Sequence, residues 1–162
     1  NEPQSDKALI PLLQEMGASI NVEGDRLIIR GGKTLKGIDI DANDFPDLIP
    51  ALCVIATQAV GKTHIYNVAQ ARIKETDRIH SMSAGLSKMG AKIETTHDGM
   101  TLWHSTLHGS HVEGFGDHRT VMALCVAGLL ASGKTVVSDA EVVNKTFPLF
   151  IEEMKLLGAN FI

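Results

Sequence analysis

The sequence predicts an α/β fold in which one unit of helix, strand, helix and hairpin recurs along the chain. Two pairs of markers share one spacing: Gly61-Lys62-Thr63 and Gly133-Lys134-Thr135 are 72 residues apart, and so are Cys53 and Cys125. A glycine signal typical of helix ends recurs at a similar spacing, in Met16-Gly17-Ala18, Met89-Gly90-Ala91 and Leu157-Gly158-Ala159. Because a fixed period marks a repeated structural unit, we expect about two such units here.

The hydrophobic pattern predicts each element of the unit in turn. An apolar helix over 47–60 precedes a strand over 62–67, and a helix over 75–89 follows with its apolar residues on one stripe. Short strands over 92–96 and 101–103 flank Asp98-Gly99, a dipeptide typical of hairpin turns. The pattern then restarts, with a helix over 118–131, a strand over 135–138, a helix over 147–157 and a strand from 159. Upstream we expect a helix over 6–16 and strands over 19–22 and 26–30.

The ends of the chain do not coincide with the ends of the repeats. The first copy lacks its apolar helix and first strand, and the last copy lacks its hairpin. The chain also begins with Asn1 rather than Met. We therefore expect a piece of a longer protein, whose preceding segment contains a small-residue apolar helix and then a strand.

Composition argues against several classes of protein. A chain of 162 residues has the length of one domain, and 15 Lys and Arg against 19 Asp and Glu give a net charge of −4. A negative net charge argues against a protein that coats nucleic acids, because such a protein needs a basic surface. Apolar runs fall short of the roughly 20 residues that span a membrane. Two cysteines are too few for a disulfide scaffold, and without a visible signal peptide the predicted location is the cytoplasm.

Two motifs have weak functional interpretations. Residues 128–135 match the Walker A pattern of nucleotide-binding loops, but a predicted helix precedes them and a strand follows. A phosphate-binding loop needs the reverse order, so we interpret this segment as a helix-to-strand turn. His104, His108 and His111 crowd a Ser/Thr/Gly-rich segment. A metal site there is the alternative to a solvated loop, although no cysteine or carboxylate pattern accompanies the histidines.

Cations lie at the predicted helix starts. Arg78, His118 and Arg119 fall in or next to first turns, and Lys145 stands just before the last helix. Each cation in a first turn opposes the helix macrodipole, at a cost of about 0.3–1 kcal/mol. A bound anion would explain why cations occur at these unfavourable positions, because it interacts favourably with both the helix N-terminus and the cations. If the helices run parallel, these starts converge on one anion site.

Two carboxylates accompany these cations. Asp47 opens the apolar helix, and Glu75 lies between Lys74 and Arg78. Beside a bound anion, Asp47 and Glu75 are candidates for acid–base chemistry. The alternative is structural, with Asp47 as a helix cap and residues 74–78 as a solvated charge run.

Four segments, in this order, resemble the 5-enolpyruvylshikimate-3-phosphate synthase family (3-phosphoshikimate 1-carboxyvinyltransferases). The Lys-Glu-Thr-Asp-Arg run of 74–78 is the most specific, and the resemblance covers nearly the whole chain. The segments are Phe45-Pro46-Asp47-Leu48-Ile49-Pro50, Arg72-Ile73-Lys74-Glu75-Thr76-Asp77-Arg78, Gly116-Asp117-His118-Arg119 with Met122-Ala123, and Asn144-Lys145-Thr146-Phe147-Pro148. The resemblance implies two similar domains, each an inside-out α/β barrel of three βαβαββ units. Residues 1–162 would be most of the C-terminal domain, with the first repeat truncated and the N-terminal domain absent.

The resemblance also implies an activity. Enolpyruvyl would pass from phosphoenolpyruvate to the 5-hydroxyl of shikimate 3-phosphate with release of phosphate, a step of the shikimate pathway to chorismate and the aromatic amino acids. No metal or organic cofactor is implied. The implied partners are the two small-molecule substrates and the N-terminal domain of the same protein, with no nucleic acid and no membrane. The chain alone is expected to be inactive, and apolar surface at its truncated repeat favours self-association.

The implied roles carry over residue by residue. Asp47 takes the proton from the 5-hydroxyl, and Glu75 handles the proton at the methylene carbon of phosphoenolpyruvate. Lys74 contacts the shikimate phosphate and shuttles protons. Gln70 stands where many family members have Asn. The sequence therefore departs from the family here, and the implied substrate contact would be made by a longer side chain. The cations that hold phosphoenolpyruvate are Arg78, Arg119 and Lys145, with His118 beside them.

Other functions remain as alternatives. The enolpyruvyl transferase that acts on UDP-N-acetylglucosamine shares the fold. A non-catalytic module could bind anions or a protein partner through the same cations. An ATPase would instead use residues 128–135.

Overall fold

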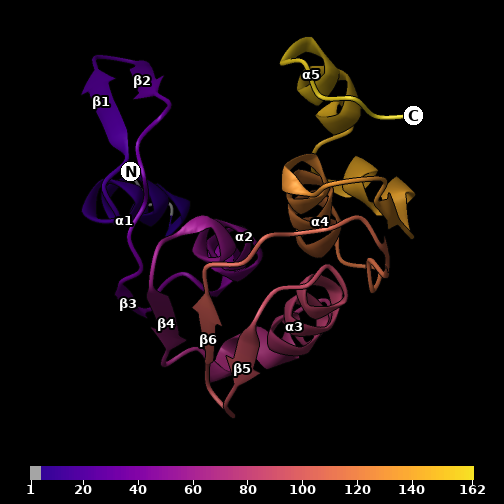
Figure 1. Ribbon diagram of the computed structural model, residues 1–162, viewed down its shortest axis with the longest axis horizontal. Coiled ribbons are helices and arrows are strands. Elements are labelled where there is room, and N and C mark those ends of the chain that lie inside the picture. Colours follow the sequence, from indigo (N-terminus) through magenta and orange to yellow (C-terminus); the bar gives the residue numbers. More distant parts are fainter. Residues whose placement is uncertain (1–4) are drawn as a thin grey trace.

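Three helices form the middle of the molecule: α2 (Ile49–Gln58), α3 (Arg78–Lys88) and α4 (His118–Leu130), each in contact with the other two (Figure 1). The computed structural model describes residues 5–162. A four-stranded sheet contacts α2 and α3 in the strand order β3 (Asp39–Asp41), β4 (Lys62–Tyr66), β6 (Met100–Trp103) and β5 (Ile93–Thr95). β3 and β4 are parallel and the other pairs antiparallel. The predicted mixed helix and sheet architecture is confirmed.

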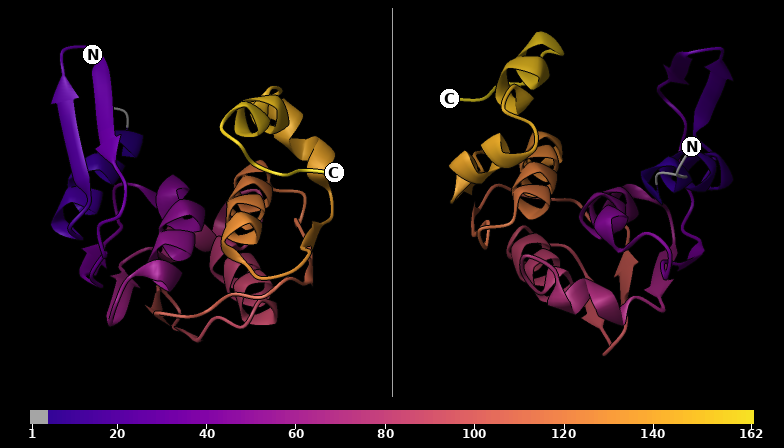
Figure 2. Two further views of the ribbon diagram at one scale, coloured as in Figure 1. Left: turned by 45° about the horizontal axis from the view of Figure 1, so that its top comes forward. Right: turned by 180° about the vertical axis from the view of Figure 1, so that it is seen from behind.

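The remaining elements lie around this centre. Near the N-terminus, η1 (Ser5–Ala8) and α1 (Leu9–Glu15) lead into the hairpin β1 (Ser19–Glu23) and β2 (Arg26–Arg30). This hairpin and α5 (Phe150–Leu156) extend away from the four-stranded sheet as two arms (Figure 2). The other elements are η2 (Pro46–Leu48), η3 (Ala69–Ile73), β7 (His111–Val112), β8 (Val136–Val137) and η4 (Ala140–Lys145). Within residues 5–162 no helix combines the length and the apolar character needed to cross a bilayer.

Strand pairing confirms the repeat of 72 residues. β3 and β4 pair in parallel with Asp39 opposite His64, and β7 and β8 pair in parallel with His111 opposite Val136. Adding 72 to the first pair gives the second. The same shift relates two isolated parallel bridges, Lys36↔Val60 and His108↔Ser132. The unit therefore recurs in backbone pairing as well as in sequence.

α3 and α4 lie in register with each other, and this brings their starts together. Gly85 of α3 faces Leu124 of α4, and a Cβ at Gly85 would lie 2.8 Å from a methyl carbon of that leucine. One turn nearer the start, the hydroxyls of Ser81 and Thr120 are 3.3 Å apart. The contacting pairs are each 39 residues apart in the chain, so the two helices run parallel without a shift. The expected convergence of helix starts is confirmed for α3 and α4.

The core is aliphatic, as the low aromatic content predicts. Leu52, Ile65, Ile79 and Met82 are among the fully buried side chains around α2 and α3. Cys53 is buried as well, and burial raises the pKa of its thiol. Cys125 is buried too. Both cysteines therefore behave as small hydrophobic residues, in agreement with the sequence.

Two predicted helix starts are wrong. The helix expected from 75 begins at Arg78, because Asp77 caps it by accepting a 2.9 Å hydrogen bond from the backbone N–H of His80. The helix expected from 147 begins at Phe150, because η4 occupies the preceding segment and ends at Lys145. Lys145 therefore closes a 3₁₀ helix and does not stand at a helix N-terminus.

The strand expected from 159 is also wrong, because residues 159–162 are not in a strand. The helices expected over 6–16 and 47–60 each begin with a 3₁₀ turn, η1 and η2, before the α-helix starts at Leu9 and Ile49. The sequence did not predict β3, β7, η3 or η4, because elements this short carry little periodicity. The expectations about Asn1 and the preceding segment lie outside the described residues.

The buried hydroxyl of Thr63 provides a test of the packing around β4. Within residues 5–162 its Oγ1 has no hydrogen-bond partner, although the residue is fully buried. Replacing the hydroxyl by a methyl group removes an unmet desolvation cost and keeps the side-chain shape. Thr63→Val is expected to raise the free energy of unfolding by about 1 kcal/mol in urea denaturation.

The matched control is Thr57 of α2, which is equally buried but donates a 2.7 Å hydrogen bond to the carbonyl of Val54. Thr57→Val is expected to lower the free energy of unfolding by about 1 kcal/mol. Equal effects of the two substitutions would contradict the assignment of Thr63 as an unsatisfied group.

Candidate active site

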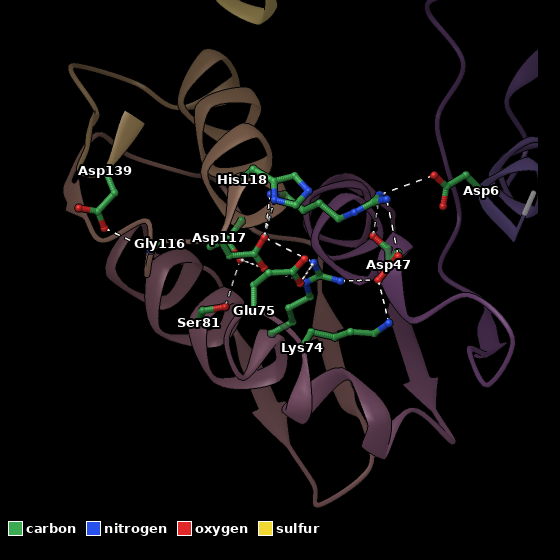
Figure 3. A network of polar contacts seen from close by, with 12 residues as sticks. Asp6, Asp47, Lys74, Glu75, Ser81, Gly116, Asp117, His118 and Asp139 are labelled. Atoms are coloured by element: carbon green, nitrogen blue, oxygen red, sulfur yellow. Dashed lines mark hydrogen bonds and ion pairs between the residues drawn. The ribbon is translucent and has the colours of Figure 1, made fainter. Parts of the chain in front are cut away.

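Polar side chains from the starts of α3 and α4 and from η2, which leads into α2, meet in one network (Figure 3). Asp47 comes from η2, Arg78 is the first residue of α3, and Asp117 precedes α4. Lys74 and Glu75 reach the network from the loop between η3 and α3. Three carboxylates and three cations, counting Arg119, thus occupy one small region, and a fourth carboxylate, Asp6 of η1, lies 3.6 Å from Arg119 Nη1 (Figure 3).

Arg78 is the centre of this network. Its Nε donates to Asp117 at 2.7 Å, its Nη1 to Asp47 at 2.6 Å and its Nη2 to Glu75 at 2.7 Å. The side chain is only 1% exposed. Burial by itself would lower the pKa of Arg78, but its hydrogen bonds and charge interactions with Asp117, Asp47 and Glu75 raise it. The guanidinium therefore stays charged inside the protein, as a buried charge can when it is fully paired.

Asp117 is the innermost of the three carboxylates, with no exposed side-chain surface. It caps α4 by accepting a 2.9 Å hydrogen bond from the backbone N–H of Arg119. Burial alone would raise its pKa. The hydrogen bond from Arg78, the N–H of Arg119 and the charges of Arg78 and His118 together hold the pKa below its ordinary value of 3.8. Asp117 is therefore an ionised, buried partner of Arg78.

Asp47 lies at the exposed side of the network, with 34% of its side chain accessible. Besides Arg78, its carboxylate is 3.3 Å from Lys74 Nζ and 3.6 Å from Arg119 Nη2. Partial burial acts to raise the pKa of Asp47, but these cations lower it overall. Asp47 is thus ionised and accessible, as a proton acceptor must be.

Arg72 positions the loop that carries Lys74 and Glu75. Its guanidinium donates to the carbonyls of Thr96 and His97 in the β5–β6 hairpin, each at 2.6 Å. It also contacts Asp77, the cap of α3, at 2.6 Å. The hairpin and the helix cap therefore hold the ends of this short loop.

The structure brings together most of the predicted site residues. Asp47, Lys74, Glu75, Arg78 and Arg119 lie in the network, and the ring of His118 lies 3.7 Å from Asp117. Two others lie apart. Gln70 donates to the carbonyl of Asn43 at 2.6 Å. Lys145, at the end of η4, is exposed and forms no ion pair within the described residues.

Carboxylates pair directly with the helix-start cations. Asp47, Glu75 and Asp117 all contact Arg78, whereas the sequence analysis placed only Asp47 and Glu75 beside the predicted anion site. Sequence reasoning assigned no role to Asp117 and Arg72. An Asp before a helix start indicates a cap, but its total burial against Arg78 follows only from the register of α3 and α4.

The alternative sites receive no structural support. Across residues 5–162, no group of three or more His, Cys, Asp or Glu side chains could hold a metal ion, so His104, His108 and His111 are not assembled as one. Gly128 lies inside α4, and Thr135 precedes β8. The Walker-like segment is therefore a helix-to-strand turn, as predicted.

Comparison with known proteins agrees with the architecture and the motifs. A sequence profile of EPSP synthase (3-phosphoshikimate 1-carboxyvinyltransferase) matches residues 1–154. The chain is 48% identical to the 3-phosphoshikimate 1-carboxyvinyltransferase of Ruminiclostridium cellulolyticum over 160 residues, which are 99% of this chain and 38% of that protein. It thus spans well under half of the relative's length.

Solved structures give the same result. EPSP synthase from Acinetobacter baumannii superimposes with a TM-score of 0.88 at 32% identity, covering 96% of this chain and 39% of that one. The enolpyruvyl transferase NikO from Streptomyces tendae superimposes with a TM-score of 0.80 at 20% identity, covering 95% of this chain and 35% of that one. The fold is therefore that of the enolpyruvyl transferases. Within that class, the chain belongs to the EPSP synthase family.

The buried ion pair of Asp117 and Arg78 predicts a pH dependence of stability. The pKa of Asp117 is lowered by folding, so its stabilisation is fully present above the ordinary value of 3.8 and is lost as the pH falls through the lower, folded-state value. At pH 7, Asp117→Asn is expected to lower the free energy of unfolding by about 3 kcal/mol, because it leaves a buried charge without its innermost partner.

Urea denaturation of the parent and of Asp117→Asn over a pH series measures this difference. It is expected to shrink progressively once the pH is below 3.8. A difference that stays constant down to the acid unfolding limit would show that the carboxylate charge of Asp117 does not contribute.

Proposed function

We propose that residues 1–162 form most of the C-terminal domain of a longer 3-phosphoshikimate 1-carboxyvinyltransferase and supply one side of its active site. The family membership and the share of its relatives' length that the chain spans support this proposal. The substrates would be phosphoenolpyruvate and shikimate 3-phosphate, and the further partner would be the N-terminal domain of the same protein. The location we propose for the full-length protein is the cytoplasm.

One observation carries the proposal. Two partly exposed carboxylates, Asp47 and Glu75, contact the two outer nitrogens of one buried guanidinium. This arrangement offers two proton-handling groups on either side of a fixed positive charge. Enolpyruvyl transfer needs both features, because protons move at two atoms while an anionic reactant is held in place.

The proposed steps balance as follows. Asp47 accepts the proton of the 5-hydroxyl as that oxygen forms a bond to C2 of phosphoenolpyruvate, and C3 takes a proton from Glu75, which enters this step as the carboxylic acid. In the resulting tetrahedral intermediate, the bond between C2 and the phosphate oxygen then breaks, and phosphate leaves with the proton that Asp47 had accepted. Glu75 recovers a proton from C3, which gives the enol ether. The pKa of Asp47 is lowered by the neighbouring cations, so the group is ionised before the reaction.

The cations would hold the anionic reactants. Arg78 and Arg119 lie beside Asp47 and are proposed to contact phosphoenolpyruvate, together with His118. Lys74 is proposed to contact the shikimate phosphate. Lys145, which is exposed, and Gln70, which is half-buried, are proposed to complete the contacts.

Substituting the two carboxylates tests this chemistry. In the full-length protein that contains this chain, Asp47→Asn and Glu75→Gln are each expected to lower kcat at least about 100-fold, because each removes a proton-transfer group. Phosphate release in a coupled assay measures the effect. Asp44→Asn, which changes an exposed aspartate of the same segment outside the network, is the matched control and should keep kcat.

The same assay separates the alternatives. Activity with UDP-N-acetylglucosamine in place of shikimate 3-phosphate would favour the sister transferase. Unchanged activity in both carboxylate variants would favour a non-catalytic anion-binding role. Loss of nucleotide binding in Lys134→Ala would favour an ATPase.

The isolated chain is expected to bind phosphoenolpyruvate weakly and to turn over no measurable substrate. Lys74, Arg78 and Arg119 are already balanced by Asp47, Glu75 and Asp117, so little positive charge remains for two phosphate-bearing reactants. The phosphate-release assay on residues 1–162 alone checks this. A rate equal to that of the full-length protein would overturn the expectation.

A further inference from the structure

Asp117 differs from the other two carboxylates in where it contacts Arg78. Asp47 and Glu75 are 34% and 47% exposed and bind the outer nitrogens, Nη1 and Nη2. Asp117 has no exposed surface and binds Nε, on the inner side of the guanidinium. The two outer carboxylates can therefore exchange Arg78 for solvent or a ligand, whereas Asp117 cannot leave without burying an unpaired charge.

We propose that Asp117 is a positioning residue that fixes Arg78 as the anchor for the anionic part of phosphoenolpyruvate. The inference rests on the proposed function, since it assigns Arg78 to that substrate. Asp117 itself would not touch the substrate. Its oxygens are already occupied by Arg78 Nε and Nη2 at 2.7 and 3.4 Å, by the N–H of Arg119 at 2.9 Å and by the hydroxyl of Thr120 at 3.4 Å.

The same carboxylate also sets the position of the second cation. By capping α4 through the N–H of Arg119, Asp117 ties the start of α4 to the first residue of α3. Arg78 and Arg119 come from different helices, yet both contact the carboxylate of Asp47. One buried side chain thus links both cations that are proposed to hold the substrate.

The charge of Asp117 matters as well as its shape. An ionised Asp117 holds Nε of Arg78 on the inner, buried side of the guanidinium. A neutral residue at 117 would leave Arg78 held mainly by Asp47 and Glu75, which are partly exposed, so the guanidinium would lose its fixed position. A substrate that depends on that position should therefore bind more weakly.

Steady-state kinetics of the full-length protein test the proposal. Asp117→Asn keeps a side-chain oxygen for the cap but removes the charge. It is expected to raise the KM for phosphoenolpyruvate about tenfold or more, while the KM for shikimate 3-phosphate changes less than about twofold. A KM for phosphoenolpyruvate within about threefold of the parent value would overturn the proposal.

Two controls separate positioning from general damage. Asp139→Asn alters a carboxylate that accepts a 3.3 Å hydrogen bond from the N–H of Gly116, next to Asp117, but is not an ion-pair partner of Arg78. Thr120→Val removes one hydrogen bond to Asp117 but keeps its charge. Both should keep the KM for phosphoenolpyruvate within about threefold of the parent value, and a rise in either equal to that of Asp117→Asn would also overturn the proposal.

A second measurement does not depend on how the Asp117→Asn variant folds. In the unsubstituted protein, the Nε–H proton of Arg78, assigned by its loss in Arg78→Lys, should show slow solvent exchange in NMR spectra. It should remain slow when phosphoenolpyruvate is added. Rapid exchange in either state would contradict a fixed Asp117 partner.

The outcomes for the two proposals are distinguishable. If the parent protein shows no turnover with phosphoenolpyruvate and shikimate 3-phosphate, the proposed function fails. Slow exchange of the Arg78 proton in the free protein would still support the fixed contact between Asp117 and Arg78, and fast exchange would reject that contact. Normal turnover with an unaffected Asp117→Asn variant rejects the anchor alone.

Discussion

The guanidinium of Arg78 lies inside the protein, and the shortest hydrogen bond of each of its nitrogens goes to a different carboxylate. An unpaired buried charge costs several kcal/mol, so the fold must supply counter-charges where Arg78 enters it. Those counter-charges come from three segments far apart in the sequence: residue 47, residue 75 and residue 117. Satisfying one buried cation therefore fixes the relative positions of η2, α3 and α4 at their starts.

Helix packing makes this convergence possible. α3 and α4 run parallel and in register, with Gly85 against Leu124, Ser81 against Thr120 and Arg78 against Asp117. The pairs change along the helices from apolar to hydroxyl to charged, so the contact becomes more polar towards the starts. The partial positive charges of helix N-termini also gather at that end, and they favour anionic groups. The carboxylates of the network lie where these dipoles and cations act together.

Much of the fold could be predicted from the sequence. The period of 72 residues, the helices and the hairpin turns are local or repetitive features, and strand pairing confirms the repeat at residue level. The candidate site could be located in outline, because helix N-termini favour anionic side chains and cations at successive helix starts are therefore conspicuous in the sequence. The burial of Asp117 depends on how two helices pack, and residues near 117 do not encode that locally. Lys145 was misplaced because a 3₁₀ helix carries no periodicity strong enough to separate it from the helix that follows.

The balance of charge within the network suggests which part of the site a second domain would have to supply, namely positive charge. Three cations face four carboxylates, counting Asp6, so the region carries no excess of positive charge. A strongly positive surface would bind anions unaided, but it would also retain the phosphate product. Without a bound anion, its cationic side chains would repel one another. A near-neutral surface with proton-handling groups needs added positive charge before it can hold two phosphate-bearing reactants. If a second domain brings that charge, closure of the two domains assembles the anion site and the acid–base groups in the same step. Proton transfer would then be confined to the state in which both reactants are bound.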